Sequence, residues 1–161
     1  QIFFCSLGGF DTHQNQVTTQ NNLLIQVGNA MKAFYDATIE MNVAQDVTTF
    51  TLSDFGRTFQ PAGANATVGS DHAWGNHHLV MGGSVFGGDF YGVPGKNGSP
   101  FPTLQLSGPD DTDTRGRWIP TSSVDQYAAT LARWFDVNAS DINTIFPQLS
   151  HFSPSHLAFL P

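Results

Sequence analysis

The sequence predicts an α/β fold in which a mostly parallel sheet is flanked by helices. Residues 2–7 (I-F-F-C-S-L) form a continuous apolar run, which is typical of a strand buried on both faces. Apolar residues recur at spacings of three and four over residues 19–41, which predicts a long helix. Residues 47–53 (V-T-T-F-T-L-S) are β-branched and apolar and predict a second strand. Strand, helix and strand in this order predict a βαβ unit with parallel strands and a right-handed crossover.

The middle of the chain, residues 59–117, is rich in Gly, Pro, Asn and Asp and predicts an insertion of short strands joined by turns. The strands of this insertion are expected at residues 78–82, 89–91 and 102–106.

Two helices are predicted near the C-terminal end. A Thr/Ser cap precedes a helix at about residues 122–135, and a second, short helix is expected to be capped by Ser140.

Length and composition predict one domain, 1–161, because the chain is 40% hydrophobic and long enough to bury a core. Six basic and thirteen acidic residues give a net charge of −7, which excludes a basic groove for nucleic acid. No run approaches the roughly 20 apolar residues that span a membrane. Because Gln1 lies almost directly in a predicted strand, we expect the C-terminal portion of a longer protein and a larger fold. Cys5, inside that strand, is interpreted as a buried structural thiol.

Three short segments carry the side chains that could bind a metal ion. D-T-H at residues 11–13 follows the first predicted strand, and S-D-F-G-R-T at residues 53–58 includes the end of the second. G-S-D-H at residues 69–72 adds another Asp and His. Carboxylates and imidazoles that arrive from separate loops are ligands of zinc and other divalent ions. The predicted metal ligands are therefore Asp11, His13, Asp54, Asp71 and His72.

Each of these residues also has a simpler interpretation. The Asp and His side chains would equally form a hydrogen-bonded polar cluster at the sheet edge, and Asp54 would cap the following turn. Arg57 is predicted to bind a substrate oxyanion, because a guanidinium group holds phosphate or sulfate with two parallel hydrogen bonds. The alternative for Arg57 is an ion pair with Asp54 or Asp71.

Longer motifs occur in a specific order over nearly the whole chain. They are G-G-F-D-T-H-x-N, S-D-F-G-R-T, G-S-D-H-A-W-G-N, G-G-S-V-F-G-G-D-F-Y-G, G-R-W-I-P-T-S-S-V-D-Q-Y and the ending F-P-Q-L-x-x-F. In these motifs the chain resembles the C-terminal half of the DUF1501 family. That family is bacterial and is grouped with the alkaline phosphatase/sulfatase superfamily. The resemblance implies an alkaline-phosphatase-like, doubly wound fold and export to the periplasm or the outside of the cell.

The resemblance also implies a two-metal hydrolytic site. Asp11 and His13 resemble the Asp and His that hold one metal in the superfamily, although the D-x-H spacing is tighter than D-x-x-x-H. Asp54 lacks the histidine that follows the corresponding Asp, so one imidazole is missing. His72 resembles the third histidine of the superfamily, with Asp71 beside it as a ligand or as its support. The nucleophilic Ser or Thr belongs to the N-terminal half, which lies outside this sequence.

Two functions are compatible with these features. The first is an exported metal-dependent hydrolase of phosphate or sulfate esters that uses zinc, manganese or calcium and needs its N-terminal half as a partner. The second is a non-catalytic extracellular binding or structural module with a degenerate metal site. The low charge and the missing imidazole favour the second function. Self-association is a further expectation.

Overall fold

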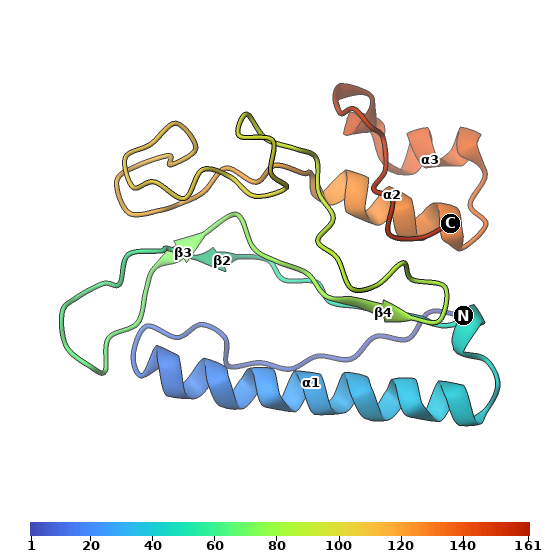
Figure 1. Ribbon diagram of the computed structural model, residues 1–161, viewed down its shortest axis with the longest axis horizontal. Helices are drawn as coiled ribbons and strands as arrows, with labels where there is room; N and C mark the ends of the chain where they lie inside the picture. Colours follow the sequence, from blue (N-terminus) through green and yellow to red (C-terminus); the bar gives the residue numbers. More distant parts are fainter.

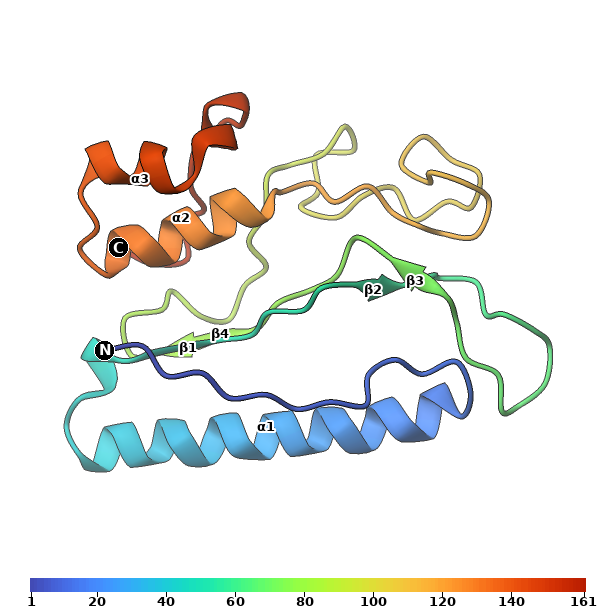
Figure 2. The ribbon, with the colours of Figure 1, turned by 180° about the vertical axis from the view of Figure 1, so that it is seen from behind.

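The computed structural model describes residues 1–161. Figure 1 shows three layers: a long helix along one side, paired strands above it, and a layer of loops and shorter helices beyond the strands. The N-terminal segment runs along the long helix, on the side that faces the strands (Figure 2). The helices are α1 (Gln16–Glu40), α2 (Val124–Trp134) and α3 (Ala139–Ile145), with 3-10 turns at Ala44–Asp46 and Pro147–His151. None of the three helices has the length and apolar character needed to span a membrane.

The strands form two antiparallel pairs, so the predicted mostly parallel sheet is wrong. β1 pairs with β4, and β2 pairs with β3, where Arg57 lies opposite His72. In Figures 1 and 2 the two pairs follow one another along a ribbon built from two chain segments that run in opposite directions. The alkaline-phosphatase-like arrangement is therefore not the fold of this chain. The four strands are β1 (Thr48–Phe50), β2 (Gly56–Arg57), β3 (His72–Ala73) and β4 (Val80–Gly82).

The apolar run at residues 2–7 is extended but is not a buried strand. Ile2, Phe3 and Phe4 are 78%, 82% and 87% exposed, and Cys5 is also exposed, so its interpretation as a buried thiol is wrong. The backbone of residues 1–9 forms no hydrogen bond within the chain. A continuous apolar run is buried only where neighbouring strands form hydrogen bonds with its backbone and other layers of the fold cover both of its faces. Because β1 pairs with β4 instead of this run, the predicted βαβ unit does not form.

The other predicted strands have mixed outcomes. β1 and β4 lie inside the predicted strands at 47–53 and 78–82. Residues 89–91 and 102–106 form no strand and belong to the loop layer. Short strands in Gly- and Pro-rich sequence depend on a partner that the local pattern does not specify.

Helix α1 confirms the helix predicted at 19–41. The chain leaves it through Asn42, which has a left-handed φ of 59°. Thr38 is buried and donates to the carbonyl oxygen of Tyr35 at 2.7 Å. Leu24 and Phe34 remain about half exposed, so the apolar stripe of α1 is only partly covered.

Helix α2 confirms the second predicted helix, and its start is set by a capping box. The backbone N–H of Gln126 donates to Ser123 Oγ at 3.1 Å, and the N–H of Ser123 donates to Gln126 Oε1 at 2.9 Å. These two bonds satisfy backbone donors that would otherwise be unpaired at the helix start. Helix α3 begins after Asn138, so the predicted cap at Ser140 is wrong by two residues.

The core lies in the C-terminal third of the chain. One cluster of buried side chains joins α2 to the end of the chain, and a second joins α2, α3 and the turn that follows α3. The first contains Tyr127, Leu157, Phe159 and Leu160, and the second contains Ala129, Ile142 and Leu149.

His78 connects this core to the strands, and its ionisation is expected to make stability depend on pH. Its ring stacks on Tyr127, with centroids 5.3 Å apart. Burial, and to a lesser extent the neighbouring His77, lowers the pKa of His78 below its usual 6.5. The unfolded chain therefore takes up this proton more readily than the folded chain. We expect the free energy of unfolding to fall as the pH decreases through 6.5.

Urea unfolding at about pH 7.5 and about pH 5.5 checks this expectation. His78→Gln should show a smaller loss of stability between the two pH values than the wild type. The exposed His151 provides a matched control, because His151→Gln should keep the full loss. An equal loss in H78Q and the wild type would contradict the assignment.

Candidate functional site

The candidate site lies where the segment before α1 crosses the β2–β3 pair. The backbone N–H of Asn15 donates to the carbonyl oxygen of Thr67 at 2.6 Å, and that of Gly69 donates to the carbonyl oxygen of His13 at 3.1 Å. The two segments touch closely at Gly69, where a Cβ atom would lie 2.1 Å from the carbonyl oxygen of Thr12. Only glycine fits this contact. It brings Asp11 and His13 beside His72.

Three of the five predicted ligands converge at this crossing. The Oδ1 atom of Asp11 lies 2.7 Å from His72 Nε2 and 2.8 Å from His13 Nε2. The two Nε2 atoms lie 3.3 Å apart. All three side chains are exposed, so an ion could reach them from solvent.

The separations of these three atoms fit a divalent ion. Ligand atoms about 2.0–2.1 Å from a zinc ion lie about 2.9–3.4 Å from one another, for octahedral or tetrahedral angles. The observed separations of 2.7, 2.8 and 3.3 Å are close to this range. Two imidazole nitrogens and one carboxylate oxygen form a ligand set that suits zinc and other transition metals.

Asp11 is held in its charged form. Its pKa is lowered mainly by a hydrogen bond with His72, then by a hydrogen bond from Arg57, and further by the charge of His13, while partial desolvation opposes the shift. The charged carboxylate is the form that ligates a metal ion. Without an ion, Nε2–H of His72 donates to Asp11, and a bound ion would take the place of that proton.

The other predicted residues lie at different distances from this cluster. Asp71 forms an ion pair with Arg115, and its Oδ1 lies 4.0 Å from His13 Nδ1. Asp71 therefore flanks the cluster without converging on it. Asp54 is exposed and lies outside the group of converging ligand atoms.

Arg57 faces Asp11 and not open solvent. Its side chain is only 11% exposed, and Nη1 donates to Asp11 Oδ1 at 2.9 Å. Its Nε donates to Ser70 Oγ at 3.3 Å, and Nη2 donates to the backbone oxygen of Ser70. The ion pair expected with Asp54 or Asp71 is not formed, because Asp11 takes that position.

The sequence of this chain matches the model of a known protein family. The family model described as "Protein of unknown function (DUF1501)" matches residues 1–144. The chain belongs to the DUF1501 family. No curated protein and no solved structure matches this DUF1501 chain.

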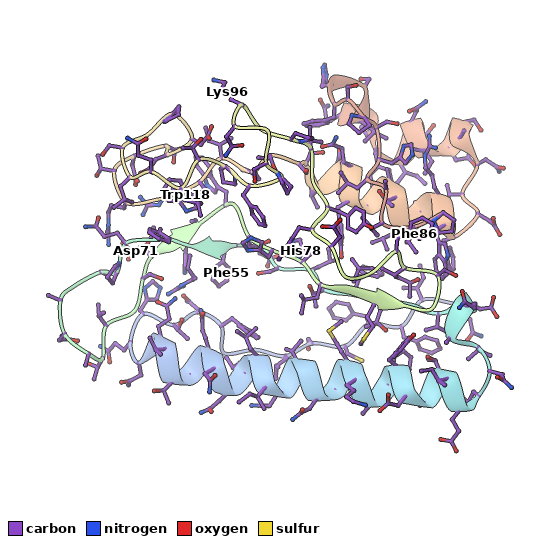
Figure 3. The ribbon with its side chains drawn as sticks, in the orientation of Figure 1. Phe55, Asp71, His78, Phe86, Lys96 and Trp118 are labelled. Carbon is purple, nitrogen blue, oxygen red and sulfur yellow. The ribbon has the colours of Figure 1, made fainter.

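Some residues around the site of this DUF1501 chain were not predicted from the sequence. The ring of Phe55 packs on His72 with centroids 4.7 Å apart and lies under the guanidinium group of Arg57, 5.7 Å from its central carbon. Arg117 Nε donates to the backbone oxygen of His72 at 3.0 Å. Figure 3 shows Phe55, Asp71 and Trp118 around the β2–β3 pair. The sequence offered one signal for Phe55, which lies inside S-D-F-G-R-T between Asp54 and Arg57, the two predicted site residues of that motif.

Proposed function

We propose that this DUF1501 chain binds a divalent metal ion through Asp11, His13 and His72. The observation that carries the proposal is the convergence of the three ligand atoms within 4.8 Å of one another. Two imidazoles favour zinc over manganese and calcium, because manganese and calcium are better suited to oxygen ligands. The exposed position of all three side chains is compatible with loading from solvent.

The function proposed for this site is hydrolysis of phosphate or sulfate esters in an exported bacterial protein. Three protein ligands leave coordination positions open, as in catalytic zinc sites. An ion bound there would polarise an ester oxygen and lower the pKa of a coordinated water molecule. Membership of the alkaline phosphatase/sulfatase superfamily and export both stay predictions.

The proposed partner is the N-terminal half of the same precursor, which would also supply a nucleophilic Ser or Thr. The support for it is the segment 1–9, whose backbone forms no hydrogen bonds and whose apolar side chains Ile2, Phe3 and Phe4 are exposed. A strand from the partner would satisfy this backbone and cover these side chains. Self-association through the same segment is the alternative.

The second candidate is a non-catalytic binding or structural module with a degenerate metal site. A specific observation favours it, which is that the arginines near the cluster are already paired. Arg57 contacts Asp11, Arg115 contacts Asp71 and Arg117 contacts Asp113. A hydrolase of phosphate or sulfate esters normally offers a guanidinium group to the oxyanion.

Metal titration followed by activity assays separates the two candidates. The purified chain is titrated with Zn²⁺, Mn²⁺ and Ca²⁺ separately, and elemental analysis measures the bound stoichiometry. One Zn²⁺ per chain, with weaker binding of Mn²⁺ and Ca²⁺, is the expected result. The loaded chain, alone and with the N-terminal half, is then assayed on an aryl phosphate and an aryl sulfate. Metal binding without turnover in both assays would favour the module, and absence of any bound metal would contradict the proposal.

A further inference from the structure

Arg57 connects two parts of the candidate site that arrive from different segments. It lies on β2 directly opposite His72 on β3, so the strand register places its backbone beside one proposed ligand. Its guanidinium group reaches across to the carboxylate of Asp11, another of the three proposed ligands. One side chain therefore links the strand pair to the loop before α1.

The guanidinium group is itself held in place. Ser70 is 3% exposed, accepts from Arg57 Nε through its hydroxyl oxygen and accepts from Arg57 Nη2 through its backbone oxygen. The hydroxyl of Ser70 then donates to Gln16 Oε1 at 2.8 Å, at the first residue of α1. The planar fork of arginine can make all of these contacts at once, whereas the ammonium group of lysine cannot.

Asp11 depends on such a contact because its own chain segment does little to fix the position of its side chain. Its side chain is 56% exposed, and it follows a segment whose backbone forms no hydrogen bonds. A carboxylate oxygen has two lone pairs, so Oδ1 can accept from Arg57 and still face an ion. Groups that orient a ligating carboxylate in this way raise metal affinity without touching the ion.

We propose that Arg57, supported by Ser70 and Gln16, is a positioning residue that holds Asp11 in the geometry needed to ligate a metal ion. This inference rests on the proposed metal site and replaces the expected role of Arg57 in gripping a substrate oxyanion. Because three of its five N–H groups donate to Asp11 and Ser70, Arg57 acts on the ligand and not on the substrate.

The test compares the affinity for Zn²⁺ of the wild type, Arg57→Gln and Arg57→Lys by calorimetric titration. R57Q is expected to bind about 10–100-fold more weakly, because Asp11 loses its support. R57K should recover only part of this loss, because lysine can reach Asp11 but cannot keep both contacts with Ser70. With Co²⁺ as a probe, the visible absorption spectrum of R57Q should change, because the coordination around the ion changes when Asp11 swings away.

Two further variants separate positioning from general structural damage. Arg133→Gln replaces an exposed arginine on α2 and should leave both the affinity and the Co²⁺ spectrum unchanged. Ser70→Ala keeps Arg57 but removes its hydroxyl contact, and it should weaken Zn²⁺ binding by less than about tenfold. If R57Q does not fold, as judged by circular dichroism, S70A and R57K carry the test.

The outcomes distinguish this inference from the proposed function. If R57Q, R57K and S70A bind Zn²⁺ with the same affinity as the wild type and give the same Co²⁺ spectrum, the positioning role is overturned and the metal site stays in place. Absence of Zn²⁺ binding by the wild type overturns both. Graded weakening in the order R57Q, R57K and S70A, with R133Q unchanged, supports the inference.

Discussion

His72→Ala is expected to weaken Zn²⁺ binding by about 100-fold or more, because it removes one of three protein ligands, and even residues that only support a ligand contribute about 10–100-fold. His72 Nε2 lies 2.7 Å from Asp11 Oδ1 and 3.3 Å from His13 Nε2, so no neighbouring imidazole can take its place without moving. Calorimetric titration with Zn²⁺ and elemental analysis after dialysis measure the loss.

The effect should be specific to the cluster. His151→Ala removes an exposed histidine outside the cluster and should bind Zn²⁺ as tightly as the wild type. His72 is itself exposed, so His72→Ala should leave the thermal unfolding of the metal-free chain nearly unchanged. Unchanged Zn²⁺ stoichiometry and affinity in H72A would mean that the ion binds elsewhere.

Ile142→Ala is expected to lower the free energy of unfolding by about 2–5 kcal/mol, because it removes a buried side chain and leaves a cavity. Ile142 is 1% exposed and packs with Ala129 of α2 and with Leu149 of the turn after α3. The same helix offers a matched control in Ile145, which is 53% exposed. Ile145→Ala makes the same chemical change without burial and should cost less than about 1 kcal/mol.

Urea unfolding, monitored by circular dichroism, compares these two variants with the wild type. A difference of at least about 1.5 kcal/mol between I142A and I145A is the expected result. Equal destabilisation by both variants would show that the contact of α3 with α2 is not part of the folded core.

The helices illustrate how much of this fold could be predicted from local sequence. The spacing of apolar residues was sufficient for α1, and a Thr/Ser cap indicated the start of α2, because a helix forms its hydrogen bonds between residues four apart. The predicted cap of α3, Ser140, lies two residues after the observed cap, Asn138, because Ser and Asn both suit a helix start.

The strands illustrate where local sequence was insufficient. Residues 2–7 have the composition of a core strand, yet the strand that pairs with β1 is β4, which lies thirty residues farther along the chain. Strand pairing is made between distant residues, and the same apolar run is buried or exposed according to what lies beside it. The prediction of a parallel sheet failed for this reason.

The candidate site depends both on local sequence and on contacts between distant residues. The sequence by itself determined the ligand types and the family motifs. Three of the five ligands that it predicted, Asp11, His13 and His72, converge in the structure, and their role as metal ligands stays a prediction. The tertiary structure alone decided how they meet, through the crossing at Gly69, and it assigned Arg57 to Asp11 while leaving Asp54 apart. The chemistry of a side chain is carried by its own residue, whereas a distance of 2.7 Å between residues 61 positions apart depends on every contact that folds the chain between them.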